Sequence, residues 1–189
     1  MKRRGQRRSD AASKRKVWTI ACLLVVCAVA LLARGVLIYR LYPLEYKDYI
    51  TRYSEEYELD PYLVCAVINA ESSFNSDVES HKGAVGLMQI MPSTGEWVAG
   101  KIGIENYSEV ILTDPETNIR IGCWYLHYLD GLFDGNDDYV IAAYNAGQGK
   151  VKEWIESDAQ LEDIPYPETK NYLEKVKTFY EIYQGLYSF

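Results

Sequence analysis

The chain has 189 residues and a formal net charge of −7, which suits one domain of ordinary size once an N-terminal segment is set aside. The charge is unevenly divided, because removing the eight basic residues and one acidic residue of residues 1–16 leaves 12 basic and 26 acidic residues, a net charge of −14. Such an acidic domain argues against nucleic acid as a partner, since phosphate binding needs clustered Lys and Arg. The two His residues stand apart and no CxxC or HExxH spacing occurs, so we expect neither a metal nor another cofactor.

The N-terminal segment is a basic tail followed by an apolar run. Residues 17–33 carry no charge, and the run continues past Arg34 to Tyr39. Residues 17–39 are long enough to span a bilayer if the charged end of Arg34 reaches the interface. Because basic residues stay on the cytoplasmic side, we expect residues 1–16 to be a cytoplasmic tail, 17–39 a single-pass anchor in the cytoplasmic membrane, and 40–189 an extracytoplasmic domain.

The alternative for this segment is a cleaved signal peptide. Ala28-Val29-Ala30 has the small-x-small pattern of a cleavage site. The triplet lies inside the apolar run, whereas a cleavage site normally follows the run. The sequence therefore favours an anchor that stays in the mature protein.

Apolar residues beyond Pro43 recur mostly at a spacing of three to four, which predicts a helical domain. Asp60-Pro61 and Asp114-Pro115 are helix start signals, because the aspartate can accept free amide hydrogens and proline suits the first helical position. The predicted helices cover residues 44–57, 61–72, 92–97, 115–129, 137–147, 151–155 and 168–183.

Two cysteines of the domain, Cys65 and Cys123, fall on apolar stretches of predicted helices. A free cysteine in such a place behaves as a small apolar residue. An oxidising exterior would also permit a disulfide between them, and the sequence does not decide between the two states. His81 and His127 are expected in a loop and on a helix surface, with no catalytic role.

One carboxylate stands where the helical pattern calls for a core residue. Val64, Val67, Ile68 and Glu71 follow the i, i+3, i+4, i+7 spacing. Burial penalises the charged form of a carboxyl group, so the pKa of Glu71 should rise, as a glycosidase requires of a general acid near neutral pH. The simpler alternative is a glutamate at the end of a helix that turns to solvent.

Four short segments follow one another along the domain. They are Glu71-Ser72, Gly86-Leu87-Met88-Gln89-Ile90-Met91-Pro92, Ala143-Tyr144-Asn145-Ala146-Gly147 and Glu168-Thr169-Lys170-Asn171-Tyr172. In this order and spacing they resemble the signature of the lytic transglycosylase domain called SLT, which is related to goose-type lysozyme. The resemblance covers residues 59–183, and it implies an all-α, lysozyme-like fold.

The resemblance also implies an activity. Its expected substrate is the glycan strand of peptidoglycan, cleaved between N-acetylmuramic acid (MurNAc) and N-acetylglucosamine (GlcNAc) to leave a 1,6-anhydromuramoyl end. Glu71 matches the catalytic glutamate, acting as acid on the glycosidic oxygen and then as base on the muramoyl C6 hydroxyl. In the family the acetamido group of the substrate is thought to replace the second carboxylate of other glycosidases.

The remaining motif residues match substrate contacts of the family, and each has a structural alternative. Ser72 could be a helix-end hydroxyl, Glu168 a helix cap, and Met91 core filler. Tyr144 could place its hydroxyl on Glu71 or on an acetamido group. The expected substrate-binding set is Ser72, Met88, Gln89, Tyr144, Asn145, Glu168 and Tyr172.

Three further acids could serve as a second carboxylate. Asp114 is better explained as a helix cap, and Asp77 and Glu79 as solvated loop residues. Two other functions remain open at this stage. A hydrolytic muramidase of the same fold would use water in place of the C6 hydroxyl. A non-catalytic module would bind the cell wall and position an envelope complex, although pure binding does not require a protonated glutamate.

Overall fold

A computed structural model describes residues 2–157 and 166–189 of the chain, with side chains from Trp18 onward. The chain divides into two units, residues 1–42 and Pro43–Phe189. The described part is helical and contains no strand, only the isolated bridges Glu79–Val85 and Val85–Ile90. The prediction of an all-α fold preceded by one N-terminal apolar helix is thus confirmed.

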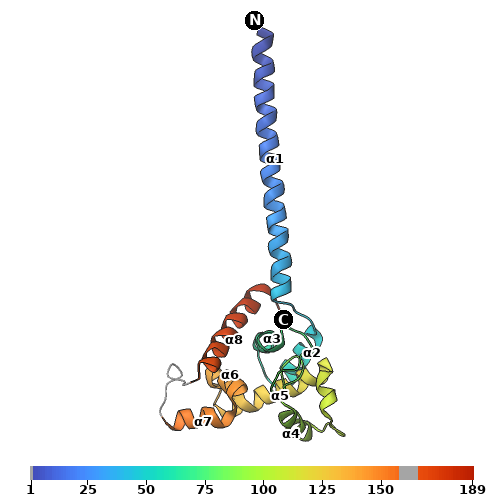
Figure 1. The fold of residues 1–189 in the computed structure, drawn as a ribbon, viewed down its shortest axis with the longest axis vertical. Helices are drawn as coiled ribbons and strands as arrows, with labels where there is room; N and C mark the ends of the chain where they lie inside the picture. The colour runs from blue at the N-terminus through green and yellow to red at the C-terminus, as the bar shows by residue number, and fades with distance from the viewer. Residues whose placement is uncertain (1, 158–165) are drawn as a thin grey trace. The chain divides into compact units, whose positions relative to one another are not determined.

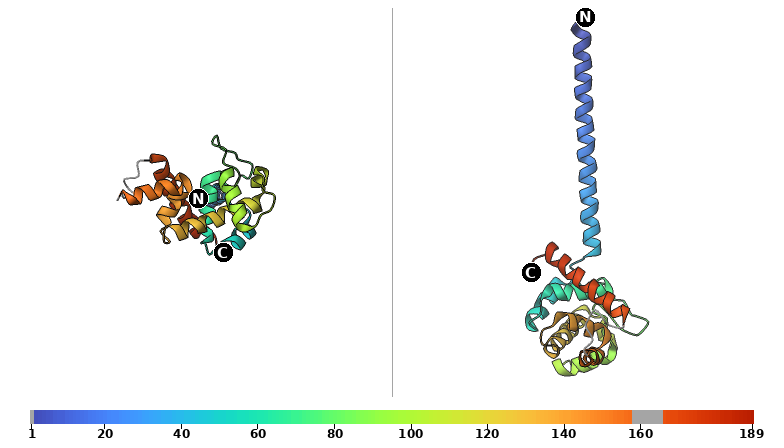
Figure 2. Two further views of the ribbon diagram at one scale, coloured as in Figure 1. Left: turned by 90° about the horizontal axis from the view of Figure 1, so that it is seen from below. Right: turned by 90° about the vertical axis from the view of Figure 1, so that its left-hand side faces the viewer.

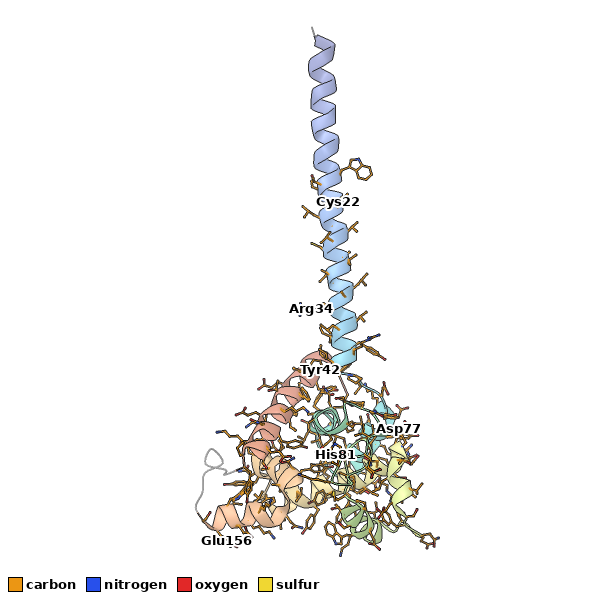
Figure 3. All side chains as sticks on the ribbon, in the orientation of Figure 1. Cys22, Arg34, Tyr42, Asp77, His81 and Glu156 are labelled. Atoms are coloured by element: carbon orange, nitrogen blue, oxygen red, sulfur yellow. The ribbon has the colours of Figure 1, made fainter. Side chains whose placement is uncertain are left out.

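The first unit is a single helix, α1, Lys2–Leu41 (Figure 1). The segment Trp18–Leu41 of this helix has 24 residues and a mean hydropathy of 2.6, and no residue of its most apolar stretch is buried. Figure 3 shows Cys22 and Arg34 along this helix. By length and composition the helix can cross a membrane, although a signal sequence near an N-terminus would have the same properties.

The second unit begins with α2, Lys47–Glu56, and α3, Pro61–Ser72. The start of α3 is as predicted, because the Asp60 side chain accepts the amide hydrogen of Tyr62 at 2.8 Å. The same device opens α5, Pro115–Leu132, where Asp114 accepts from the amide of Thr117 at 2.9 Å. Helix α2 starts three residues later than predicted, because Tyr46 has a φ of 57° and cannot continue a helix.

The other elements are α4 (Pro92–Ile102), the 3₁₀ helix η1 (Glu109–Thr113), α6 (Asp137–Ala146), α7 (Gln148–Glu156) and α8 (Pro167–Leu186). Helix α4 runs five residues beyond the predicted end, since Val98 and Ala99 are buried in the core and Gly103, at φ 73°, ends it. The sequence prediction missed η1, whose five residues are too few to show a helical period.

Helix α3 lies at the centre of the core. It packs against α8 on one side and α2 on another, as Figures 1 and 2 show. Consecutive residues from Val64 to Ile68 have no exposed surface, so the helix is covered nearly all round. Cys65 and Cys123 are both buried and free, so the disulfide that the sequence permitted is not formed, and burial raises the pKa of the Cys65 thiol to about 12.

Candidate active site

Glu71 lies in the last turn of α3, at the wall of a pocket of about 430 Å³. The helix ends at the next residue, Ser72, because Ser73 adopts a φ of 52°. Val64, Val67 and Ile68 on the same stripe are fully buried, so the carboxyl group emerges from the core into the pocket. Burial raises the pKa of Glu71 from 4.5 to about 7, and the group is therefore largely protonated below neutral pH.

Two neighbours oppose this rise. The hydroxyl of Tyr172 faces Glu71 and lowers the pKa of the carboxyl group. This contact does not have the geometry of a full hydrogen bond, and the Tyr172 hydroxyl has no other hydrogen-bond partner in the described residues. Lys175 also lowers that pKa by its charge, and its ammonium group donates to the carbonyl of Ala70 at 2.7 Å. Burial is the larger effect, so the net direction is upward.

An irregular loop of residues 78–91 also lines the pocket, and a side chain from α5 fixes this loop. Asn118 accepts the amide hydrogen of Met88 at 2.8 Å and donates to the carbonyls of Val85 at 2.9 Å and Leu112 at 2.8 Å. Gly86 has a φ of 79°, and a Cβ there would overlap the side chain of Asn118. Asn118 is 1% exposed, and the sequence analysis missed it. The feature of the sequence that could have indicated a role for Asn118 is its place beside the apolar positions of a predicted helix.

Gln89 reaches the pocket from this loop with a φ of 48°. Its amide nitrogen donates to the carbonyls of Val78 and Gly86, each at 3.0 Å. The amide oxygen accepts no hydrogen bond from the described protein and can accept one from a ligand. Neither of these hydrogen bonds joins Gln89 to Glu71.

Tyr144 lines the pocket from α6, but its hydroxyl donates to the carbonyl of Met88 at 2.8 Å and not to Glu71. Burial, and then the charge of Glu71, raise the pKa of Tyr144 well above 10. The phenol therefore stays protonated and holds the loop in place. Asn145, the next residue, also lines the pocket, and its side-chain oxygen accepts from the hydroxyl of Thr169 at 3.1 Å.

Three predicted substrate contacts, Ser72, Met88 and Tyr172, do not line the pocket. Tyr172 is buried, and its hydroxyl faces Glu71. The Ser72 hydroxyl is buried and donates to the carbonyls of Ile68 at 3.2 Å and Leu87 at 2.8 Å, which ties α3 to the loop. Met88 is fully buried, and its sulfur occupies the space that a Cβ on Gly122 would need. The physical reason is the direction of the backbone: Met88 points into the core while its neighbour Gln89 points into the pocket.

Several pocket residues were not expected from the sequence. Met91, considered as core filler, is 40% exposed and lines the pocket. Glu168, which does belong to the predicted set, also lines the pocket and faces Lys82 at 3.9 Å. Ser80 accepts from the amide of Ala84 at 2.9 Å, which shapes the loop. The pocket residues without a place in the predicted set are Ser80, Lys82, Ala84, Met91, Ala146, Lys150, Tyr166 and Thr169.

The other titratable residues considered from the sequence lie outside the pocket. Asp77 and Glu79 are exposed loop residues, and Asp114 caps α5. His81 is exposed in the same loop as Asp77, as Figure 3 shows, and His127 is exposed on α5. Within residues 18–157 and 166–189 no cluster of side chains is suited to a metal ion.

A second hollow of about 260 Å³ adjoins the pocket. The two share Gln89, Tyr144 and Asn145, so they form one groove past Glu71. An aromatic row continues from the groove, because the ring of Tyr125 is 5.5 Å from Tyr144 and 6.3 Å from Tyr128. Aromatic rings beside polar groups are suited to sugar rings, which have apolar faces and polar edges.

Comparison with known proteins now decides the family. Residues 48–166 match the family described as "Transglycosylase SLT domain". The chain belongs to this family. The soluble lytic murein transglycosylase of Escherichia coli K12 is 39% identical over 151 residues, which are 76% of this chain and 23% of that protein. The membrane-bound lytic murein transglycosylase C of Klebsiella pneumoniae strain 342 is 32% identical over 169 residues, covering 74% of this chain and 46% of that one.

Solved structures agree with this assignment. An inactive glutamate-to-glutamine mutant of the lytic transglycosylase Slt from Pseudomonas aeruginosa gives a TM-score of 0.74 at 34% identity, over 78% of this chain and 25% of that one. The 70-kDa soluble lytic transglycosylase in complex with bulgecin A gives 0.72 at 38% identity, over 78% and 25%. The lysozyme-like fold expected for the family is therefore confirmed. The chain spans about a quarter of the length of the soluble relatives and 46% of that of the membrane-bound one.

Proposed function

We propose that the domain is a peptidoglycan lytic transglycosylase that cleaves the MurNAc–GlcNAc bond and forms 1,6-anhydromuramoyl ends. The observation that carries the proposal is the carboxyl group of Glu71, whose pKa of about 7 is set by burial at the wall of an open groove. A general acid works best when its pKa is close to the working pH. Family membership supports the same reaction, since the relatives are named lytic murein transglycosylases.

The reaction needs one carboxyl group in two successive roles. Protonated Glu71 donates its proton to the glycosidic oxygen as the bond from that oxygen to the muramoyl C1 breaks. The resulting carboxylate then accepts the proton of the C6 hydroxyl, whose oxygen bonds to C1 and closes the anhydro ring. The proton count balances, because Glu71 ends the cycle protonated.

A second protein carboxylate is poorly placed to take part. Glu168 is the other acid that lines the pocket among the described residues, and its side chain is 78% exposed and faces Lys82. Glycosidases with two carboxylates place both beside the scissile bond. In our proposal the acetamido group of the substrate stabilises the developing positive charge at C1 instead.

The groove residues give the substrate its position. The free oxygen of Gln89 and the side chain of Asn145 are suited to sugar hydroxyl and acetamido groups. Tyr144 and Ser72 act indirectly, since their hydroxyls fix the loop of residues 78–91 through Met88 and Leu87. We assign both to positioning, and Met88 to the support of that loop.

We further propose that α1 holds the domain at the outer face of the cytoplasmic membrane as a single-pass anchor with a cytoplasmic N-terminus. The eight basic residues of 1–16 favour that orientation. Relatives described as membrane-bound support membrane association.

The test is Glu71→Gln in the full-length chain, assayed on purified peptidoglycan. The amide keeps the shape of the side chain but cannot cycle a proton, so cleavage should fall by about 10²–10⁴-fold. Glu174→Gln is the matched control, because Glu174 is an exposed glutamate of α8 outside the pocket. If Glu71→Gln keeps more than about a tenth of the wild-type rate, well short of that loss, Glu71 is not the acid.

Mass spectrometry of the products separates the competing functions. Anhydro ends support the transglycosylase, and reducing ends would show that the domain is a hydrolytic muramidase. A zymogram without any clearing, together with binding to cell-wall material, would show a non-catalytic binding module.

A further inference from the structure

Lys175 on α8 binds the last turn of α3, the turn that carries Glu71. Its ammonium group donates to the carbonyl of Ala70, the residue before Glu71, at 2.7 Å. The last four carbonyls of a helix have no partner within the helix, and a cationic side chain near that end can bind them and interacts favourably with the helix dipole. Lys175 is therefore a cap for the C-terminal end of α3 that another helix supplies.

A second contact holds the side chain of Lys175 in this place. Its ammonium group lies over the ring of Phe179, one turn further along α8, at 5.6 Å from the ring centroid. A cation at this distance is attracted to the face of an aromatic ring. Lys175 is exposed, so its substitution leaves no cavity in the core and the domain should still fold.

The position of Lys175 places a positive charge near the carboxyl group of Glu71. Among the described residues it is the charged group with the largest effect on the pKa of Glu71, which it lowers. Tyr172 on α8 and Tyr144 on α6 are also close to Glu71, but burial raises the pKa of both phenols well above 10, so they stay neutral. The other charged side chains around Glu71 are those that line the pocket, Lys82, Lys150 and Glu168.

We propose that Lys175 is a positioning residue for the cleavage reaction, which fixes the turn that carries Glu71 and stabilises the carboxylate that Glu71 becomes after it donates its proton. This inference rests on the proposed function, since it concerns the same site. The carboxylate forms in a partly desolvated place, where a negative charge is costly, and a fixed cation beside it reduces that cost. Lys175 does not line the groove, so it should act on turnover and not on substrate affinity.

The experiment measures cleavage of soluble peptidoglycan strands as a function of pH, with the full-length chain in detergent. Lys175→Met keeps a side chain of similar length but removes the charge, and Lys175→Arg keeps the charge. Lys177→Met is the matched control, because Lys177 lies on the same helix but its ammonium group binds Asp138, at 2.7 Å.

Lys175→Met should move the alkaline limb of the pH profile of kcat/KM to higher pH by roughly 0.2–0.7 units, the effect of an exposed charge. It should also reduce kcat by roughly two- to five-fold with little change in KM. Lys175→Arg should restore the wild-type limb and kcat, and Lys177→Met should leave both unchanged.

A purely structural role of Lys175 would reduce stability and leave the alkaline limb in place. A limb that stays in place in Lys175→Met, or a kcat that does not fall, would therefore overturn the inference. A limb that moves as far in Lys175→Arg or in Lys177→Met would overturn it as well, since both variants keep a charge at position 175.

A titration without substrate separates this inference from the proposed function. NMR spectra of the full-length chain with isotope-labelled glutamate report the protonation of Glu71, and Glu71→Gln assigns its signal. If the wild type cleaves no glycan, the proposed activity is refuted, whereas a midpoint for Glu71 that rises in Lys175→Met but not in Lys175→Arg still shows that Lys175 stabilises the carboxylate. The same midpoint in all variants refutes the inference.

Discussion

Glu71→Gln should change the dependence of stability on pH, in addition to its effect on activity. In the folded protein the carboxyl group keeps its proton up to about pH 7, whereas the unperturbed group loses it near pH 4.5. Between these values the folded state binds more protons than the unfolded state, so the free energy of unfolding decreases as the pH rises. The wild type therefore carries a cost above pH 7 that is absent below pH 4.5.

The size of this cost follows from the two pKa values. A change from 4.5 to about 7, at about 1.4 kcal/mol for each pH unit, corresponds to about 3 kcal/mol. Glu71 keeps some contact with solvent in the pocket, which reduces the figure to about 2–3 kcal/mol. Glutamine has no charge to bury, so the variant should gain that amount relative to the wild type between pH 4 and pH 8.

Urea unfolding of both proteins at pH 4 and pH 8, followed by circular dichroism, measures the effect. The difference in unfolding free energy between variant and wild type should be about 2–3 kcal/mol larger at pH 8. Glu174→Gln, at an exposed position, should change stability by less than about 0.5 kcal/mol at either pH. A difference between Glu71→Gln and wild type that is the same at both pH values would show that Glu71 is not desolvated by the fold.

Three further outcomes are expected. Tyr172→Phe removes the hydroxyl that lowers the pKa of Glu71, so the alkaline limb of the pH profile of kcat/KM should move to higher pH. An alkaline limb that stays in place would show that Tyr172 does not lower the pKa of Glu71. Asn118→Ala removes two hydrogen bonds to the loop that carries Gln89 and one to Leu112 of η1. It should reduce the free energy of unfolding by about 3 kcal/mol in a urea titration, whereas a loss below about 1 kcal/mol would mean that the loop keeps its conformation without Asn118. Residues 17–39 should remain in the mature protein and resist carbonate extraction from membranes, and a mature N-terminus near residue 31 would show cleavage instead.

Elements that depend on local interactions could be predicted from the amino-acid sequence. The starts of α3 and α5 could be predicted because Asp60 and Asp114 each bind an amide only two or three residues away. The burial of the α3 stripe, and with it the raised pKa of Glu71, could be predicted because periodicity records which face of a helix meets the core. The family could be recognised because four motifs keep their order along the chain.

Which motif side chains reach the pocket depends on contacts between residues far apart in the chain. The loop of residues 78–91 has no period that would separate inward from outward positions, and its path is fixed by Asn118, which lies 30 residues from Met88 in the chain. This path buries Met88 and exposes Gln89, although both belong to one motif. The fold also brings Lys82 and Lys150 to one pocket from distant segments. This could not be predicted, because charged surface residues form no periodic pattern in the sequence that indicates which cavity they line.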